Sequence, residues 1–377
     1  MSEMNRIPCV IMRGGTSKGI YLKANHLPQD KEARDKAILA IFGSPDVRQI
    51  DGLGGADPLT SKVAIIGPSS HPDADVDYTF GQISINTPYV DYTGNCGNIS
   101  SGVGPFAIDE GLVKAVSPVT LVRIHNTNTG KILLAEVPTE NGRAKVSGDC
   151  KIDGVPGTGA EIMIDFSGTA GSATNKLLPT GNPVDTITTS VGPIDISIVD
   201  VSNPCVFVRA KDMGMTGGET PQVINGNAKL LALMEEIRAQ ATVMIGMAPD
   251  VQTATAKSPA FPMVAFVAPA ADYVDFTTGK TIEKQQVDFL SRMMFMQVLH
   301  KTYPGTGTAC TGAAAKIPGT IVHETIPHID SIKVIKIGHP AGVIEIEAGF
   351  ENGNLVRAAF ARTARRIMEG YVFVKNF

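Results

Sequence analysis

Short apolar runs rich in Val and Ile, separated by turns that contain Gly and Pro, recur along most of this 377-residue chain. Runs of this length and composition are typical of β-strands. Strands are predicted in this way at 63–66, 119–124, 132–137, 194–201, 206–208, 332–337 and 343–347. Asn141-Gly142 and Asn352-Gly353 each stand between two strand-like runs, and Asn-Gly in that position predicts a tight β-hairpin.

Helical periodicity is confined to fewer segments. Apolar residues recur at helical spacing in 31–42, 227–244 and 281–300, and we expect the last of these helices to end at His300. Two shorter helices, rich in small residues, are expected to start directly after Cys96 and Cys310. Because the predicted strands outnumber the helices and follow one another in hairpins, the predicted fold class is α+β.

Three local patterns occur twice, in the same order. They are Pro8-Cys9-Val10-x-x-Arg13 and Pro204-Cys205-Val206-x-x-Arg209, then the glycine-flanked Cys96 and Cys310, then Glu140-Asn-Gly and Glu351-Asn-Gly. A repeat of this length indicates two domains of similar build. We expect each to be a curled, mostly antiparallel sheet around a central helix, with a cleft between the two. A linker is predicted at 177–193, which divides the chain into 1–184 and 185–364.

Composition excludes several classes of function. With 43% hydrophobic residues, 19% charged residues and a net charge of −4, the chain is typical of a soluble globular protein. Neither nucleic acid nor a membrane is an expected partner. Five dispersed cysteines and the lack of an apolar signal sequence predict free thiols and a cytoplasmic location. His323 and His328 do not have the spacing of zinc ligands, so no metal site is predicted.

Cys96 is the first candidate for chemistry. A thiol at the start of a helix lies at the positive end of the helix dipole, which favours the thiolate. The backbone N–H groups of Gly97 and Asn98 can bind a carboxylate, and those of Thr311 and Gly312 are predicted to do the same in the second half. The alternative is a small buried cysteine in a tight turn. The repeated glycine context favours a functional loop, although we interpret the Cys310 thiol itself mainly as a packing residue.

Three further candidates lie elsewhere. The segment 13–19, with the hydroxyls of Thr16 and Ser17, predicts an anion-binding turn, although a structural glycine hairpin is the alternative. Lys62 opens a predicted strand after a glycine-rich approach. Lysines at strand ends are usually solvated, but one in a partly desolvated cleft can act as a base. His300, at the end of a predicted helix, is either a binding residue or a helix cap.

Four motifs resemble those of a known enzyme family. They are 13–19 (RGGTSKG), 55–62 (GADPLTSK), 94–98 (GNCGN) and 316–320 (KIPGT), and the resemblance covers essentially the whole chain. The family is the Δ-isomerase branch of the diaminopimelate epimerase-like fold. It includes 2-methylaconitate isomerases, 4-oxalomesaconate tautomerases and 3-methylitaconate Δ-isomerases. The chain is most similar to the last group, known from nicotinate-fermenting bacteria.

This resemblance implies specific roles. Lys62 and Cys96 would be catalytic, Ser17 and His300 would support them, and four copies of the chain would form a homotetramer. The chain end, 365–377, would return to the first domain, with 367–372 beside 152–155. In contrast to amino-acid epimerases of this fold, Cys96 is followed by Gly-Asn-Ile and not by Gly-Asn-Gly, which argues against simple epimerisation.

The implied reaction is a 1,3-proton shift that needs no cofactor. The expected substrate is a small unsaturated dicarboxylate, with (R)-3-methylitaconate converted to 2,3-dimethylmaleate. Within the branch, methylaconitate and oxalomesaconate remain alternative substrates. In other classes, an amino-acid epimerase and a non-catalytic dicarboxylate-binding protein remain open.

Overall fold

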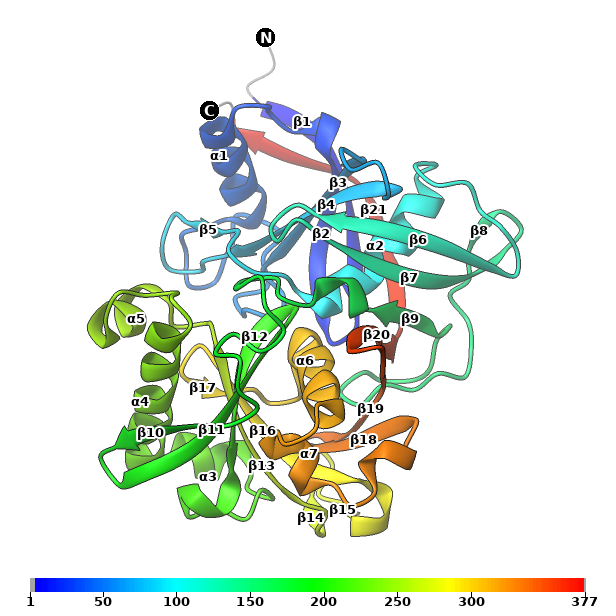
Figure 1. Ribbon diagram of the computed structural model, residues 1–377. Helices are drawn as coiled ribbons and strands as arrows, with labels where there is room; N and C mark the ends of the chain where they lie inside the picture. Colours follow the sequence, from blue (N-terminus) through cyan, green and yellow to red (C-terminus); the bar gives the residue numbers. More distant parts are fainter. Residues whose placement is uncertain (1–3, 376–377) are drawn as a thin grey trace. The chain divides into compact units, whose positions relative to one another are not determined.

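The computed structural model describes residues 4–375, which form two compact units (Figure 1). Within the described part, unit 1 comprises 4–164 and 361–375, and unit 2 comprises 165–360. The chain therefore changes unit at 164/165 and 360/361, whereas the sequence predicted 184/185 and 364/365.

Unit 1 consists of hairpins and two helices of about three turns. In chain order its elements are β1 (Met4–Gly14), β2 (Ser17–Lys23), α1 (Lys31–Phe42), β3 (Lys62–Pro68), β4 (Val76–Ile83), β5 (Val90–Asp91), α2 (Gly97–Asp109), β6 (Val119–Asn126), β7 (Lys131–Glu140), β8 (Arg143–Ala144), β9 (Ile162–Asp165) and β21 (Ala364–Lys375). The predicted helix at 31–42 is confirmed as α1. Asp30 caps its N-terminus by accepting the Ala33 N–H, and Gly43 ends it in the left-handed conformation (φ 70°).

Unit 2 has a similar set of elements. They are β10 (Asp185–Thr189), β11 (Gly192–Val201), β12 (Asn203–Arg209), α3 (Pro221–Asn225), α4 (Ala228–Met244), α5 (Val251–Lys257), β13 (Met263–Pro269), β14 (Tyr273–Val274), β15 (Thr281–Ile282), β16 (Phe289–Phe295), β17 (Val298–Leu299), α6 (Gly305–Lys316), α7 (Ile321–Thr325), β18 (Val334–His339), β19 (Gly342–Glu351) and β20 (Asn354–Arg362). The last two residues of β20, Ala361 and Arg362, already belong to unit 1. The predicted helix at 227–244 is confirmed as α4, which Asn227 caps.

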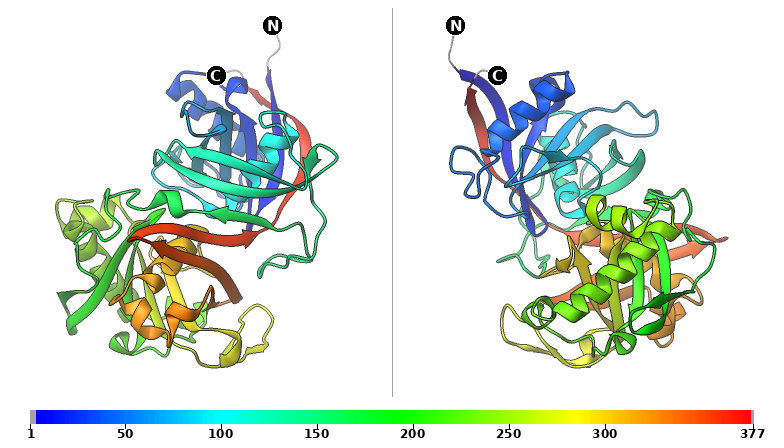
Figure 2. Two further views of the ribbon diagram at one scale, coloured as in Figure 1. Left: turned by 45° about the vertical axis from the view of Figure 1, so that its right-hand side comes forward. Right: turned by 90° about the vertical axis from the view of Figure 1, so that its left-hand side faces the viewer.

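The two units repeat one strand connectivity. In unit 1, β1/β2 is antiparallel, β2/β3 parallel, β3/β4 antiparallel, β4/β6 parallel and β6/β7 antiparallel. The same sequence of pairings runs through β11, β12, β13, β16, β18 and β19 in unit 2. Helices α2 and α6 are buried along almost their whole length, and each packs against strands of its own unit (Figure 2). The predicted α+β class and central helices are confirmed.

Two of the three repeated patterns that suggested this duplication are not structurally equivalent. Cys9 lies in β1, whereas Cys205 lies in β12, which has the connectivity of β2. Cys96 precedes α2, whereas Cys310 is the sixth residue of α6. The Asn-Gly turns do correspond, and both residues of each turn have positive φ, as a type I′ hairpin requires.

The predicted helix at 281–300 is wrong, because this segment forms β15, β16 and β17. Strand β16 is buried on both faces from Phe289 to Met294, so its apolar residues are continuous and do not alternate. Periodicity alone does not distinguish such a strand from a buried helix. His300 therefore follows a short strand and does not cap a helix.

The segment before the predicted linker belongs to unit 2 because Asp200 of β11 holds it. The fully buried Asp200 carboxylate accepts the N–H groups of Ala173 and Thr174 at 2.9 and 2.8 Å. The chain end does return to unit 1, but β21 pairs with β1 along its length, from Met4↔Lys375 to Gly14↔Ala364 (Figure 1). The strand partner of 367–372 is therefore β1, whereas the resemblance implied 152–155.

Membrane-spanning helices and metal-binding clusters are considered next, together with the cysteines. Within residues 4–375, no helix is long and apolar enough to cross a membrane. In the same range, no group of three or more His, Cys, Asp or Glu side chains could hold a metal ion. The five cysteines are free thiols, of which Cys96 and Cys150 are partly exposed and the other three buried.

Candidate active site

Cys96 is the N-cap of α2, so the predicted helix start is confirmed. The first helical hydrogen bond runs from the Ser100 N–H to the Cys96 carbonyl at 2.8 Å. Among the described residues, the preceding N–H groups of Gly97, Asn98 and Ile99 have no hydrogen-bond partner. A partly exposed thiol therefore stands beside three unpaired donors at the positive end of a helix, an arrangement that can bind a carboxylate.

Lys62, the first residue of β3, is only 6% exposed. Its Nζ donates to Gln82 Oε1 at 2.5 Å and lies 5.3 Å from the centre of the Phe80 ring. The Gln82 amide is fixed with its oxygen towards Lys62, because its nitrogen donates to the carbonyls of Pro58 and Ser61. The alternative of a solvated lysine at a strand end is thus excluded, and the Lys62 amine has a neutral amide as its hydrogen-bond partner.

The turn between β1 and β2 lies directly against the first turn of α2. A Cβ placed on Gly14 would lie 2.4 Å from the Asn98 carbonyl oxygen, and one on Gly15 would lie 2.2 Å from Asn98 Oδ1. The Asn98 side chain also donates to Thr16 Oγ1 at 3.0 Å. Glycine at 14 and 15 is therefore required by this close approach, and Asn98 ties the turn to the helix.

Ser17 has a buried hydroxyl with no hydrogen-bond partner among the described residues, although the residue is only 3% exposed. Buried hydroxyls in native proteins are nearly always paired, so such an oxygen indicates a place for a water molecule or a ligand.

Close contacts also join β2 to the strand that carries Lys62. A Cβ on Gly19 would lie 2.8 Å from the Lys62 carbonyl oxygen and 3.0 Å from Ile99 Cδ1. The Lys18 N–H donates to the Leu59 carbonyl at 2.9 Å. The structure therefore brings together, within unit 1, the elements that carry six predicted site residues: Thr16, Ser17, Lys62, Cys96, Gly97 and Asn98.

Two arginines form hydrogen bonds at this turn, Arg13 and Arg362, and Arg362 was not predicted from the sequence. Arg13 donates to the carbonyls of Gly15 and Thr363 at 2.9 and 2.8 Å, so it braces the turn. Arg362 donates from Nε to Asn98 Oδ1 at 3.2 Å, and burial lowers its pKa to about 10. Its charge interacts with Cys150 and, less strongly, with Cys96. No local signal marks Arg362, because it lies 264 residues from Asn98.

The other three predicted residues belong to unit 2. His300 Nδ1 accepts the Thr302 N–H at 3.2 Å, so a neutral His300 carries its hydrogen on Nε2. Thr311 is fully buried, with its hydroxyl 3.0 Å from that of Tyr303, and a Cβ on Gly312 would meet Ile346 at 2.6 Å.

The expectation of free N–H groups at Thr311 and Gly312 is wrong. Helix α6 begins at Gly305, so both residues lie in the helix interior, where N–H groups bind carbonyls of the preceding turn. The first hydrogen bond at this end is from the Thr308 N–H to the Pro304 carbonyl at 2.8 Å. The N–H groups before the first helical bond are those of 305–307.

Comparison with known proteins identifies the family. The profile described as PrpF protein matches residues 4–375. The chain belongs to the PrpF protein family.

Several PrpF-like relatives are similar over their full length. A 3-methylitaconate isomerase from Eubacterium barkeri is 68% identical, with 100% of this chain and 99% of that protein aligned. A (4E)-oxalomesaconate Delta-isomerase from Novosphingobium sp. is 42% identical over 99% of this chain and 98% of that protein.

Solved structures agree with the fold. The crystal structure of a methylitaconate-delta-isomerase has a TM-score of 0.90 at 68% identity and covers 99% of this chain and 97% of that one. A hydroxyproline epimerase from Agrobacterium vitis has a TM-score of 0.55 at 13% identity, covers 100% of this chain and 94% of that one, and shows the fold alone.

The glycine contacts of this PrpF-family chain can be tested by Gly15→Ala. Gly15 has φ +51°, and the new methyl group would displace Asn98, so we expect a loss of about 2–4 kcal/mol of unfolding free energy from strain and overpacking together. Gly142→Ala is the matched control, since Gly142 has φ +77° but nothing within 4 Å of the added Cβ. It should lose only about 1 kcal/mol. Equal losses in denaturant melts of the two variants would contradict the contact.

Proposed function

We propose that this chain is an isomerase that converts (R)-3-methylitaconate to 2,3-dimethylmaleate by a 1,3-proton shift. One observation carries the proposal. A buried lysine and a cysteine at a helix start lie in the same unit of a chain that is 68% identical, end to end, to a 3-methylitaconate isomerase. Lys62 and Cys96 are the proposed proton carriers.

The chemistry follows from the substrate. A base removes the proton from the methyl-bearing carbon, which is also bonded to a carboxylate and allylic to the double bond. The electron pair spreads into a dienolate, and an acid then protonates the terminal methylene carbon to form the second methyl group. Both steps are general acid–base catalysis, so no redox cofactor is part of the proposed mechanism.

The difficult step is proton removal beside a carboxylate that is already negative. Donors that are preorganised around the developing enolate charge lower this barrier. The unpaired N–H groups of 97–99 and the unpartnered Ser17 hydroxyl are proposed to bind the substrate carboxylate and the enolate oxygen. The buried Arg362 adds positive charge near Cys96. Among the predicted residues of unit 2, His300 remains a proposed substrate ligand.

The alternatives have less support. Oxalomesaconate is the substrate named for a relative that is 42% identical, and 2-methylaconitate that of one 38% identical, against 68% for the methylitaconate enzyme. The epimerase shares only the fold. Two charged side chains next to the site, Lys62 and Arg362, are basic, whereas an amino acid would also need an acidic partner for its ammonium group.

A side-by-side assay of methylitaconate, methylaconitate and oxalomesaconate tests the proposal. We expect kcat/KM for methylitaconate to exceed the other two by about tenfold or more. Both alternatives carry a third carboxylate, and even one extra methylene in a pocket costs about 1–3 kcal/mol. In D2O, the product should carry deuterium in a methyl group. A preference for either tricarboxylate would overturn the substrate assignment. Tight binding of methylitaconate without deuterium incorporation would identify a binding protein.

The proposal extends to assembly and location. We propose a cytoplasmic homotetramer with a role in nicotinate fermentation, as the family resemblance implies. The free thiols are consistent with a reducing compartment. The long strand β21 exposes Ile367, Tyr371 and Phe373, and apolar surface of this kind is typical of contacts between subunits. Light scattering coupled to size exclusion measures the assembly directly.

A further inference from the structure

Three asparagines form a hydrogen-bonded chain between the elements that hold Lys62 and Cys96. Asn95 precedes Cys96, Asn126 ends β6, and Asn128 lies in the turn that follows β6. Asn126 is fully buried, and its side-chain nitrogen lies 3.4 Å from Asn95 Oδ1 and 3.3 Å from Asn128 Oδ1. Asn126 and Asn128 have no motif around them in the sequence, and Asn95 is noted there only as part of the 94–98 motif. The proposed chemistry uses none of the three.

Asn95, at one end of the three hydrogen-bonded asparagines, holds the backbone of Cys96 in place. Asn95 Oδ1 accepts the Cys96 N–H at 2.7 Å and the Ser100 hydroxyl at 3.1 Å, in addition to the Asn126 amide. The side-chain oxygen of Asn95 thus forms hydrogen bonds to the N-cap residue, to the first turn of α2 and to β6. Because Asn126 is the donor to this oxygen from β6, it anchors the start of α2 to the sheet.

Asn128, at the other end of the three asparagines, holds the part of β4 that contacts Lys62. Asn128 accepts the Phe80 N–H and donates to the Phe80 carbonyl, both at 2.8 Å, so its side chain replaces a neighbouring strand at that residue of β4. It also donates to the Tyr92 carbonyl at 2.8 Å. The Phe80 ring lies against Lys62, and Gln82, two residues further along β4, accepts from Lys62 Nζ.

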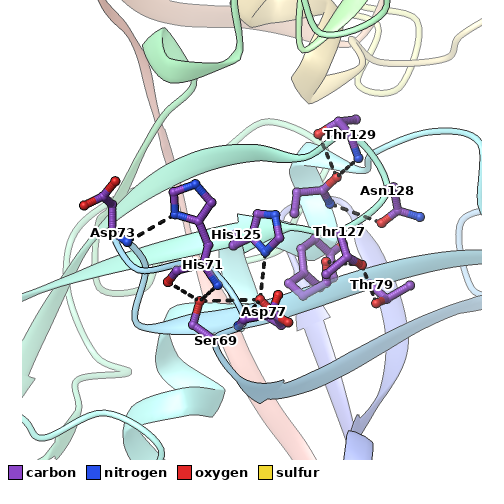
Figure 3. A network of polar contacts seen from close by, with 12 residues as sticks. Ser69, His71, Asp73, Asp77, Thr79, His125, Thr127, Asn128 and Thr129 are labelled. Carbon is purple, nitrogen blue, oxygen red and sulfur yellow. Dashed lines mark hydrogen bonds and ion pairs between the residues drawn. The ribbon is translucent and has the colours of Figure 1, made fainter. Parts of the chain in front are cut away.

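The orientation of the Asn126 amide is fixed by Thr129. The Thr129 N–H and hydroxyl donate to Asn126 Oδ1 at 3.0 and 2.9 Å, which leaves the amide nitrogen to face the other two asparagines. Figure 3 shows Thr127, Asn128 and Thr129 together in this turn, with the Thr127 hydroxyl paired with Thr79 instead. The turn after β6 therefore contains two residues that bind the Asn126 side chain, Asn128 and Thr129, and one that does not, Thr127. We call Asn95, Asn126 and Asn128 the asparagine network.

We propose that Asn126 and Asn128 are positioning residues that fix the spacing between Lys62 and Cys96. This rests on the proposed function insofar as those two side chains carry the proton. Neither asparagine contacts them directly; Asn126 acts through Asn95, and Asn128 through Phe80. Displacing a reacting group by about 1 Å can cost up to 10²-fold in rate, so a loosened network should appear mainly in kcat.

The test uses Asn126→Asp and Asn128→Asp, which keep the accepting oxygen and remove the donating nitrogen. Thr127→Asp is the matched control, because it adds the same charge to the same turn outside the network. We expect each asparagine variant to lower kcat by about tenfold or more with KM within about threefold, and the control to stay within twofold. Asn128→Asp decides the question if Asn126→Asp does not fold.

A second measurement does not depend on the reaction. Iodoacetamide alkylation, followed by peptide mass spectrometry, compares Cys96 with Cys150, the other partly exposed thiol of unit 1. We expect the Cys96 rate in Asn126→Asp to change at least threefold while the Cys150 rate does not. Unchanged kcat and Cys96 reactivity in both folded variants would overturn the inference, as would an equal effect of Thr127→Asp. A wild-type chain without isomerase activity would overturn the proposed function instead, and the alkylation rates would still decide whether Asn126 positions Cys96.

Discussion

Replacing Lys62 by methionine is expected to lower kcat for methylitaconate by about 10²–10⁴-fold, the usual contribution of a positioned acid or base. Methionine has nearly the same length as the lysine stem and can keep the packing against Phe80. Gln82 is partly exposed, so water can replace the lost donor to its oxygen. The variant should therefore fold, and steady-state kinetics with a thermal melt will separate catalysis from stability.

Lys36→Met is the control for this change. Lys36 lies on α1, its side chain is 59% exposed, and it pairs with Glu32 in the preceding turn of the same helix. Activity should stay within about twofold, because surface substitutions of this kind have small effects. A folded Lys62→Met variant with near-normal turnover would remove Lys62 from the mechanism.

Cys96→Ala is expected to cost about 10²-fold or more in kcat for the same physical reason, the loss of a proton carrier. The helix start should survive, since the hydrogen bonds at this residue are made by its backbone. The Cys96 N–H donates to Asn95 Oδ1, and the Cys96 carbonyl accepts from the N–H and the hydroxyl of Ser100. The N–H groups of Gly97 and Asn98 also remain, so substrate binding should persist and KM should change less than kcat.

Cys150→Ala controls for the removal of a thiol. Cys150 is likewise partly exposed and in unit 1, and burial raises the pKa of its thiol, which makes it a poor nucleophile or base at neutral pH. Its replacement should leave turnover unchanged. Equal losses in the two cysteine variants, or none in Cys96→Ala, would contradict the assignment of Cys96.

Local signals in the sequence were sufficient for much of the fold. Asp30 and Gly43 delimit α1, the Asn-Gly pairs form the expected hairpins, and the glycines around Cys96 do mark a helix start. Each of these features depends on residues within about one helical turn. That is the range over which backbone preference and capping act.

The incorrect and missing predictions concern features that depend on contacts between residues far apart in the sequence. Because β16 is buried on both faces, the periodicity of its apolar residues did not distinguish it from a helix. The matching patterns around Cys9 and Cys205 suggested equivalent strands, but Cys9 lies in β1 and Cys205 in β12, which corresponds to β2. Arg362 reaches Asn98 from 264 residues away. Asn126 and Asn128 acquire a role only once β6 is paired with β4. No window of sequence contains both partners of these contacts.

The pairing of β1 with β21 affects the order in which the chain can fold during synthesis. Because β1 pairs with β21, β1 leaves the ribosome long before the strand that pairs with its edge has been made. All of 165–360 is made in between, so unit 2 can reach its native contacts first. Until β21 is made, the edge of β1 that it will occupy stays open. Contacts between residues so far apart in the sequence form slowly. We therefore expect misassembly, and the need for chaperones, to be greatest at this stage.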